Sequence, residues 1–341
     1  RTKSSLAFWK AMEKKGEIKV MAIVTVENLR KSYDDLEAVK GISFNIKQGE
    51  VFGFLGPNGA GKTSTINMLI GLARPTGGKI LIDGIDAVKS IKKVQSIIGI
   101  IPDENNLYPE MDGFDNLCFC ASLYGMAKKE RERKAKELLE QFDLAKAGKR
   151  PFKAYSKGMR RKITIAAGLI HNPKILFLDE PTTGIDVESA RQIRELLLDL
   201  KRQGKTIFIT THYIEEAERI CDRIAFIVNG KIVKEGTITE LMENVEREHK
   251  IKLVLDGNVE KLKEEMEDIF SNCHIEIPAE NSCLLISQEP VPLSPILQFL
   301  DSKGINVYEA KELKPSLEDV FVKVTGIRAS KLVKEKEKVG R

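Results

Sequence analysis

Gly56-Pro57-Asn58-Gly59-Ala60-Gly61-Lys62-Thr63-Ser64-Thr65 separates two apolar runs, residues 51–55 before it and residues 66–70 after it. A buried strand, a glycine-rich loop and a helix in this order are the context that the phosphate-binding motif G-x-x-x-x-G-K-[ST] requires. The sequence therefore predicts a P-loop that binds a nucleoside triphosphate, rather than a glycine turn that happens to precede a helix.

The residue types of this loop explain its chemistry. Glycines let the backbone turn its N–H groups inward as a nest for an anion, and the following helix directs its positive dipole end at the phosphate. We expect Lys62 to reach the β- and γ-phosphates and the Thr63 hydroxyl to hold Mg²⁺.

Composition sets the limits of the other interpretations. The chain has 341 residues, of which 42% are hydrophobic and 31% charged, which is typical of a soluble globular protein of two or three domains. A formal net charge of +5 is too small to indicate nucleic acid by itself. No apolar run approaches the ~18–20 residues that cross a bilayer. The five cysteines form no C-x-x-C pair, so a reducing cytoplasm is the simpler expectation.

Two further strands end in polar residues. Residues 174–180 form an apolar strand that ends in Asp179 and Glu180, and an unpaired buried charge is costly. We expect Asp179 to meet the Mg²⁺ held at Thr63 and Glu180 to polarise the attacking water; a surface-exposed strand end is the alternative. The strand 205–210 is followed by His212, which would face the same phosphates if this strand lies beside the first.

The remaining segments indicate an α/β chain with insertions. Residues 24–47 are expected to form short strands, with Tyr33 in a turn where its ring could stack on a base. Apolar residues between 114 and 144 follow helical spacing, and a further helix is expected at 160–170. Residues 223–228 and 231–233 flank Asn229-Gly230, which predicts a hairpin. The order strand, helix, strand, strand, helix, strand over 250–310 is similar to a split βαβ, ferredoxin-like module.

Taken together, residues 24–236 resemble the nucleotide-binding subunits of ABC transporters. Residues 56–63 match the Walker A loop, residues 175–180 match Walker B with its adjacent glutamate, and residues 181–186 match the D-loop. Ser156-Lys157-Gly158-Met159 matches the ABC signature, His212 the switch histidine and Tyr33 the adenine-stacking aromatic. The ending 313–326 resembles the close of the C-terminal extension of multidrug and antibiotic exporter ATPases.

Two positions depart from the family pattern. Lys157 replaces the first glycine of the signature pair, where it could strengthen a phosphate contact or face solvent. Asp103 stands where the Q-loop normally has glutamine; aspartate can accept hydrogen bonds from water and ligate Mg²⁺, but it cannot donate.

The resemblance implies these site residues. The catalytic set is Glu180, His212 and Asp103, and the metal set is Thr63, Asp179 and Asp103. The nucleotide-binding set is Tyr33, Gly56, Pro57, Asn58, Gly59, Ala60, Gly61, Lys62, Thr63, Ser64, Ser156 and Gly158.

The expected architecture is a P-loop NTPase α/β core (residues 21–238) with an N-terminal antiparallel β-subdomain and a helical subdomain at about 104–160. A small C-terminal α+β domain (239–326), an N-terminal extension (1–20) and a basic tail (327–341) complete it. The extension is expected to have no catalytic role, with a membrane-surface anchor as the alternative. The tail could lie near anionic lipid or be a disordered end.

In this family ATP lies between two chains, so one copy of each motif implies a dimer, either a homodimer or a pair with a paralogue. We expect an ATPase that uses ATP and Mg²⁺, lies at the cytoplasmic face of the membrane and powers a separately encoded permease for export, without nucleic acid. The alternatives are a soluble ABC protein acting on ribosomes or DNA, and an importer ATPase.

Overall fold

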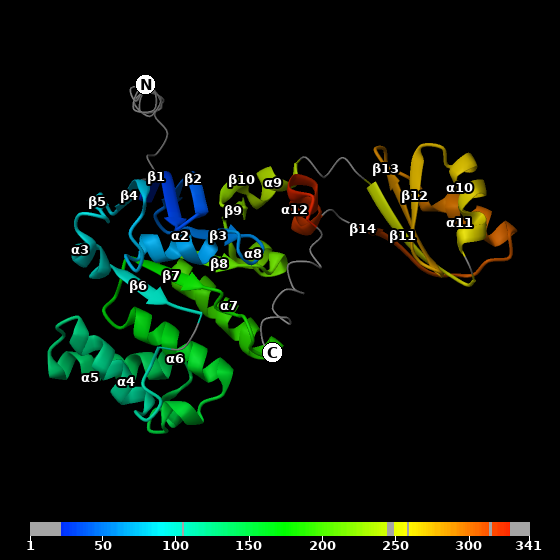
Figure 1. Cartoon of the computed structure of the whole chain (residues 1–341). Helices are drawn as coiled ribbons and strands as arrows, with labels where there is room; N and C mark the ends of the chain where they lie inside the picture. Colours follow the sequence, from blue (N-terminus) through cyan, green and yellow to red (C-terminus); the bar gives the residue numbers. More distant parts are fainter. Residues whose placement is uncertain (1–21, 104–105, 244–248, 258, 314–315, 328–341) are drawn as a thin grey trace, which may run out of the picture. The chain divides into compact units, whose positions relative to one another are not determined.

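The computed structural model describes residues 22–103, 106–243, 249–257, 259–313 and 316–327 (Figure 1). The N-terminal extension and nearly all of the basic tail lie outside the described residues. The chain divides into two compact units, and the boundary along the chain falls between Glu235 and Gly236. Within the described residues, no helix combines the length and the apolar character that crossing a membrane requires.

A six-stranded sheet forms the centre of the first unit. Its strands are β3 (Val51–Leu55), β6 (Ile98–Ile101), β7 (Ile175–Asp179), β8 (Thr206–Thr211), β9 (Arg223–Val228) and β10 (Lys231–Thr237), in the order β10-β9-β3-β8-β7-β6. The pairs β6/β7, β7/β8, β8/β3 and β3/β9 are parallel. Every residue of β3, β7 and β8 is buried, as expected of parallel strands covered on both faces. The predicted P-loop α/β core is therefore confirmed.

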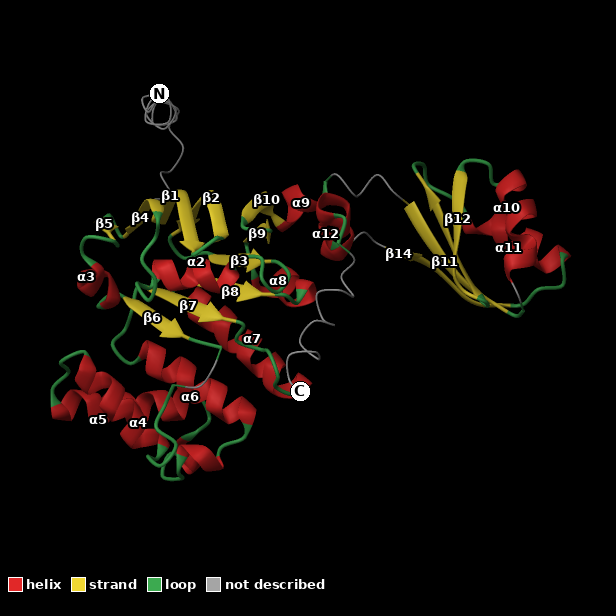
Figure 2. Ribbon diagram, in the orientation of Figure 1, coloured by secondary structure: helices red, strands yellow, loops and turns green. Residues whose placement is uncertain are grey.

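Helices cover both faces of this sheet (Figure 2). On one face lie α2 (Lys62–Leu69) and the short α3 (Ile91–Gln95), and on the other lie α6 (Lys157–Leu169), α7 (Val187–Arg202) and α8 (Ile214–Ile220). The predicted hairpin is present: β9 and β10 are neighbours joined by Asn229 and Gly230, both with positive φ.

The N-terminal β-subdomain is a four-stranded sheet in the order β2-β1-β4-β5. It consists of β1 (Ala22–Tyr33), β2 (Leu36–Lys47), β4 (Gly77–Ile82) and β5 (Ile85–Asp86), and all its pairs are antiparallel. The expectation of short strands over 24–47 is wrong, because β1 and β2 each run for twelve residues. A register shift beside Asn28, whose φ is 47°, breaks the apolar alternation without ending the strand.

The helical subdomain contains α4 (Gly113–Leu123), α5 (Lys128–Gln141), the short 3₁₀ turns η2 (Ala145–Ala147) and η3 (Phe152–Ala154), and the start of α6. Helix α6 begins at Lys157, three residues before the predicted start at Arg160. The reason is a side-chain cap: the Ser156 hydroxyl accepts a hydrogen bond from the Met159 N–H at 3.2 Å. The signature residues therefore form the N-terminus of a helix.

A buried network of ion pairs links β9 to β10 and to the residue that precedes β3. Arg223 lies 2.9 Å from Glu50 and also contacts Glu235, and its guanidinium lies 5.2 Å from the centre of the Phe52 ring. Burial raises the pKa of both carboxyl groups, and the positive charge of Arg223 opposes this rise.

Replacing Arg223 with leucine is expected to lower the free energy of unfolding by about 3–5 kcal/mol, because two buried carboxyl groups lose their cation. Urea denaturation followed by circular dichroism measures the change. Arg191→Leu is the matched control: Arg191 contacts Glu188 and Glu195 on the exposed face of α7, where ion pairs contribute little. Equal midpoints for the two variants would contradict the dependence on burial.

The second unit contains a ferredoxin-like module. Its elements are β11 (His249–Leu255), η4 (Val259–Leu262), α10 (Lys263–Ile269), β12 (Cys273–Ala279), β13 (Ser282–Ser287), α11 (Leu293–Ser302) and β14 (Val307–Leu313). The strand order β12-β13-β11-β14, with every pair antiparallel, is that of a split βαβ fold and confirms the prediction. Two helices that were not predicted, α9 (Ile238–Met242) and α12 (Leu317–Thr325), pack against each other in this unit.

Candidate active site

The P-loop joins β3 to α2, and three of its glycines are required by the backbone. A Cβ atom at Gly56 would lie 2.2 Å from the Ile227 carbonyl oxygen, and one at Gly61 would lie 2.7 Å from that of Ala38. Gly59 and Gly61 also have φ angles of 75° and 105°, which side chains disfavour. Of the other residues predicted to bind nucleotide here, Pro57, Asn58 and Ser64 are half-buried and Ala60 is buried.

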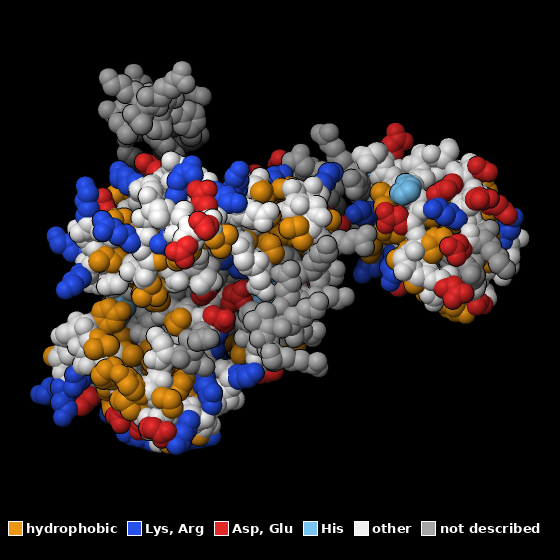
Figure 3. Space-filling model, viewed as in Figure 1, with side chains coloured by type: hydrophobic (Ala, Val, Ile, Leu, Met, Phe, Trp, Pro, Cys, Tyr) orange, Lys and Arg blue, Asp and Glu red, His pale blue; other side chains and the backbone are white. Residues whose placement is uncertain are grey.

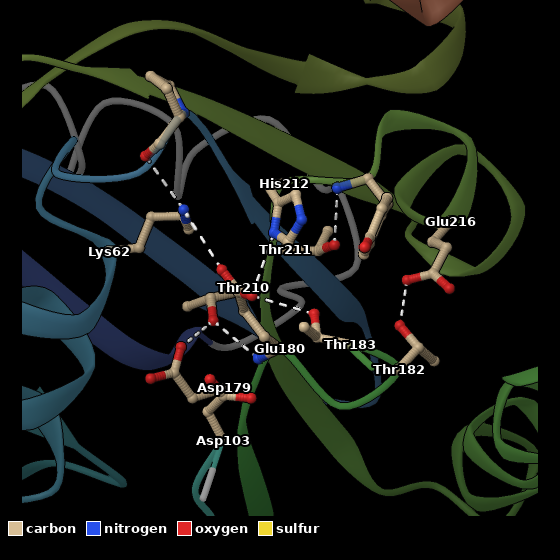
Figure 4. Close-up of polar contacts among 12 residues, drawn as sticks. Lys62, Asp103, Asp179, Glu180, Thr182, Thr183, Thr210, Thr211, His212 and Glu216 are labelled. Atoms are coloured by element: carbon tan, nitrogen blue, oxygen red, sulfur yellow. Dashed lines mark hydrogen bonds and ion pairs between the residues drawn. The ribbon is translucent and has the colours of Figure 1, made fainter. Parts of the chain in front are cut away.

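Lys62 is the first residue of α2, and its side chain is buried. The Nζ donates hydrogen bonds to the carbonyl oxygens of Gly56 at 2.8 Å and Pro57 at 3.1 Å, and lies 3.6 Å from Glu180 Oε1. The ammonium group is therefore held inside the loop, beside the carboxylate of Glu180, which directly follows β7 (Figure 4).

Asp179 is the last residue of β7, and Thr210 is the last but one of the neighbouring parallel strand β8. The predicted adjacency of these strands is confirmed, since Asp179 pairs with Thr210 in the register of β7 and β8. The Thr210 hydroxyl donates to Asp179 Oδ1 (Figure 4). Burial raises the pKa of Asp179, the hydrogen bond from Thr210 opposes the rise, and the charges of Glu180 and Asp103 add to it. A cation at this position would relieve the buried charge.

The Glu180 carboxylate lies against side chains from several segments of the site. Its Oε1 faces Lys62, while its Oε2 accepts a hydrogen bond from the Thr183 hydroxyl at 3.0 Å and lies 3.1 Å from His212 Nδ1. The last contact is close but is not aligned as a hydrogen bond. The backbone of Glu180 has φ 46°, a conformation that costs energy for a residue with a side chain and that is held by hydrogen bonds from its N–H to the backbone and hydroxyl oxygens of Thr210.

The structure thus brings together Lys62, Asp179, Glu180 and His212, all with buried side chains, at the carboxyl edge of the central strands. Thr63 is exposed in the first turn of α2, which packs against β7. Asp103 lies beside Asp179 and is partly exposed (Figure 4). This edge is where ligands bind in α/β folds of this kind.

Three predicted nucleotide-binding residues lie elsewhere in the unit. Tyr33 ends β1 with 43% of its surface exposed, and Lys31 Nζ lies 4.5 Å from the centre of its ring. Ser156 is exposed at the N-terminus of α6, and Gly158 is buried there against Ser189. Lys157, the departure from the signature pattern, is exposed on the same turn.

Sequence reasoning missed several residues of this site. Thr210 and Thr183 contact the two carboxylates directly, and their positions next to a strand end and in the loop after Glu180 were the only signals. Arg161 was also missed. Its guanidinium is buried and donates to the carbonyl oxygens of Pro102 at 2.6 Å and Asp103 at 2.8 Å.

Comparison with known proteins agrees with this geometry. A family model described as ABC transporter matches residues 39–183. The chain is 36% identical over 310 residues to the linearmycin resistance ATP-binding protein LnrL of Bacillus subtilis, covering 89% of this chain and 98% of the relative. It is 33% identical over 303 residues to the daunorubicin resistance ATP-binding protein DrrA3 of Streptomyces coeruleorubidus, covering 89% and 96%.

Solved structures give the same result for the fold. The protein cbiO1 from Clostridium perfringens, part of an ABC transporter complex, matches with a TM-score of 0.61 and 29% identity, over 73% of this chain and 97% of its own. A bacterial ABC transporter cassette solved as a dimer matches with a TM-score of 0.59 and 28% identity, over 63% of this chain and 98% of its own.

Proposed function

The chain belongs to the ABC transporter family as an ATP-binding and ATP-hydrolysing subunit, and we propose that it powers export of a drug-like or lipophilic compound through a separately encoded membrane permease. The observation that carries this proposal is the extent of the match. Similarity to two proteins named for antibiotic resistance covers 89% of this chain, a span too long to be confined to the ATPase unit.

The residues of the site divide the work of hydrolysis. The P-loop N–H groups and Lys62 would bind the β- and γ-phosphates, and Glu180 would accept a proton from the attacking water. His212, 3.1 Å from the same carboxylate, would hold Glu180 in position. Lys62, whose Nζ lies 3.6 Å from Glu180 Oε1, would also balance the charge of this carboxylate.

Thr63 and Asp179 would hold Mg²⁺ together with the phosphates, and the ion would neutralise charge that develops on them. The donor set fits this role, because Asp179 is buried among other carboxylates and the Thr63 hydroxyl is exposed nearby on α2. Among the described residues, no group of three His, Cys, Asp or Glu side chains could hold a metal ion by itself, which agrees with a site completed by phosphate oxygens. Asp103 remains a proposed third ligand.

The signature residues favour a shared site. The exposed Ser156 hydroxyl and the N-terminus of α6 would contact the γ-phosphate of ATP held by a partner chain. Tyr33 would stack on the adenine, and the sequence has no [NT]-K-x-D motif for guanine. The partner is a second copy or a paralogue; no nucleic acid is expected.

An exposed hydrophobic surface on the helical subdomain is the proposed permease contact. Leu123, Tyr124 and Tyr108 are 71%, 40% and 52% exposed around α4, and hydrophobic side chains gather over this subdomain in Figure 3. Tyr124 also lines a cavity of about 420 Å³ with Met126 and His171. Contiguous apolar surface of this kind marks protein contacts. Docking there would place the chain at the cytoplasmic face of the membrane.

Replacing Leu123 with glutamate is expected to weaken permease binding about tenfold or more, because a charge enters an apolar contact. The ATPase rate of the isolated chain should stay at the wild-type value. Titration of the detergent-solubilised permease, with ATPase stimulation as the signal, measures both. Val233→Glu is the control, since Val233 is an exposed hydrophobic residue on β10. Wild-type stimulation of Leu123→Glu would contradict the assignment of this surface.

The whole proposal is tested by expressing the chain with a candidate permease in a drug-sensitive host. Export predicts resistance to an amphipathic antibiotic and ATP-dependent loss of the drug from cells, both abolished by Lys62→Ala. Uptake of a solute instead would indicate an importer. Activity that responds to ribosomes or DNA but not to the permease would favour the soluble class of ABC proteins.

A further inference from the structure

A buried arginine of helix α6 contacts the segment that follows β6. Arg161 lies in the second turn of α6, and its side chain is 6% exposed. Nη1 donates to the Pro102 carbonyl oxygen at 2.6 Å, and Nη2 donates to that of Asp103 at 2.8 Å. Nη2 also lies 3.5 Å from Asp103 Oδ1. A planar guanidinium can span two successive carbonyl groups in this way, whereas a lysine ammonium acts as a point charge.

The charges around Arg161 belong to the active site. Burial lowers the pKa of Arg161, and the charges of Asp103, then Asp179 and then Glu180 oppose that effect. The same three carboxylates repel one another, since Glu180 and Asp103 both raise the pKa of Asp179. Arg161 therefore supplies, from the side of α6, the positive charge that Lys62 supplies from the side of the P-loop.

The position of Asp103 explains why an arginine is useful here. A glutamine can both donate and accept hydrogen bonds, whereas an aspartate can only accept. An aspartate at position 103 also has a charge that the guanidinium can pair with, 3.5 Å away, and both hydrogen bonds to the backbone carbonyl groups of this segment come from Arg161.

We propose that Arg161 is a positioning residue that joins Asp103, at the nucleotide, to the signature end of α6, so that the two move as one body during the ATPase cycle. This proposal rests on the ATPase function above. Ser156 caps the same helix five residues before Arg161, so a shift of Asp103 by nucleotide is transmitted to the end that meets the partner's ATP.

The first test measures turnover. Arg161→Gln is expected to lower kcat for ATP about 10–10²-fold with little change in KM, because positioning acts on the reacting geometry and not on substrate binding. The kcat of Arg161→Lys should lie between those of wild type and Arg161→Gln, since lysine keeps the charge but cannot span both carbonyl groups. Arg160→Gln is the matched control: Arg160 is the preceding residue and donates to the Lys153 carbonyl, away from Asp103.

The second test uses the pair. Asp103→Gln alone should cost less than Arg161→Gln, because the guanidinium still holds both carbonyl groups. The double variant Asp103→Gln with Arg161→Gln should hydrolyse ATP about threefold faster than Arg161→Gln alone, because Asp103 no longer adds a negative charge to the carboxylates of the site once the guanidinium is lost. A double variant that is no faster, or a KM that rises as much as kcat falls, would overturn the proposal.

A third measurement does not depend on hydrolysis and so separates this proposal from the proposed function. Amide hydrogen exchange of the nucleotide-free protein should be faster in Arg161→Gln than in wild type, both in residues 98–103 and in residues 157–161. Unchanged exchange in residues 98–103 would contradict the link even if the chain proved not to hydrolyse ATP.

Discussion

Replacing Glu180 with glutamine is expected to lower ATP hydrolysis by about 10²–10⁴-fold while ATP binding stays intact. Glutamine keeps the size of the side chain and the oxygen that accepts from Thr183, but it cannot take a proton from water. The neighbouring carboxylate, Asp179, accepts the Thr210 hydroxyl and would hold Mg²⁺, so it is not expected to replace Glu180 as the base.

The measurement is steady-state phosphate release together with the dissociation constant for ATP. The variant should also accumulate as an ATP-bound dimer, detectable by sedimentation, because the step that separates the chains is blocked. Glu137→Gln on α5 is the control, as this carboxylate lies on the exposed face of the helical subdomain with Arg133 and Lys134. Hydrolysis near the wild-type rate in Glu180→Gln would remove Glu180 from the role of base.

The central sheet and the P-loop could be predicted because local sequence specifies them. An apolar run that is followed by glycines, as in β3, or that ends in Asp179 and Glu180, as in β7, leaves few alternatives to a parallel strand that ends at a phosphate site. The meeting of Glu180 with His212 also followed from the sequence, since each comes directly after one of two strands that pair in parallel.

Other features depend on contacts that sequence does not show. Arg161 holds carbonyl groups 58 and 59 residues earlier in the chain, and no local pattern reports such a distance. Helix α6 begins three residues before the predicted start at Arg160, because the Ser156 hydroxyl caps the helix at that point. The helix α12 was missed, although Ser316 and Asp319 form a capping box at its start.

If two chains share each ATP site, substitutions at Ser156 and Lys62 are each expected to have a large effect on ATPase activity. Ser156→Arg should abolish activity in a homodimer, because a bulky side chain replaces the exposed hydroxyl at the tip of α6. Lys62→Ala should also abolish activity, because the buried ammonium that holds the phosphate loop is lost. Neither change touches the residue that the other removes.

Mixing the two inactive chains is expected to restore ATPase activity. A heterodimer contains one intact site, made of Lys62 from the Ser156→Arg chain and Ser156 from the Lys62→Ala chain. In an equal mixture about half of the dimers are heterodimers, and each of these has one working site out of two. The mixture should therefore recover up to about a quarter of the wild-type rate. Wild-type specific activity should also rise with protein concentration, since dimers form by mass action. Activity that is independent of concentration down to the nanomolar range, with a monomer in sedimentation and no recovery on mixing, would rule out the shared site. Because one chain carries a single P-loop and a single signature, it would then have to complete its ATP site without Ser156, and the soluble, non-transporter class would become the better account of this protein.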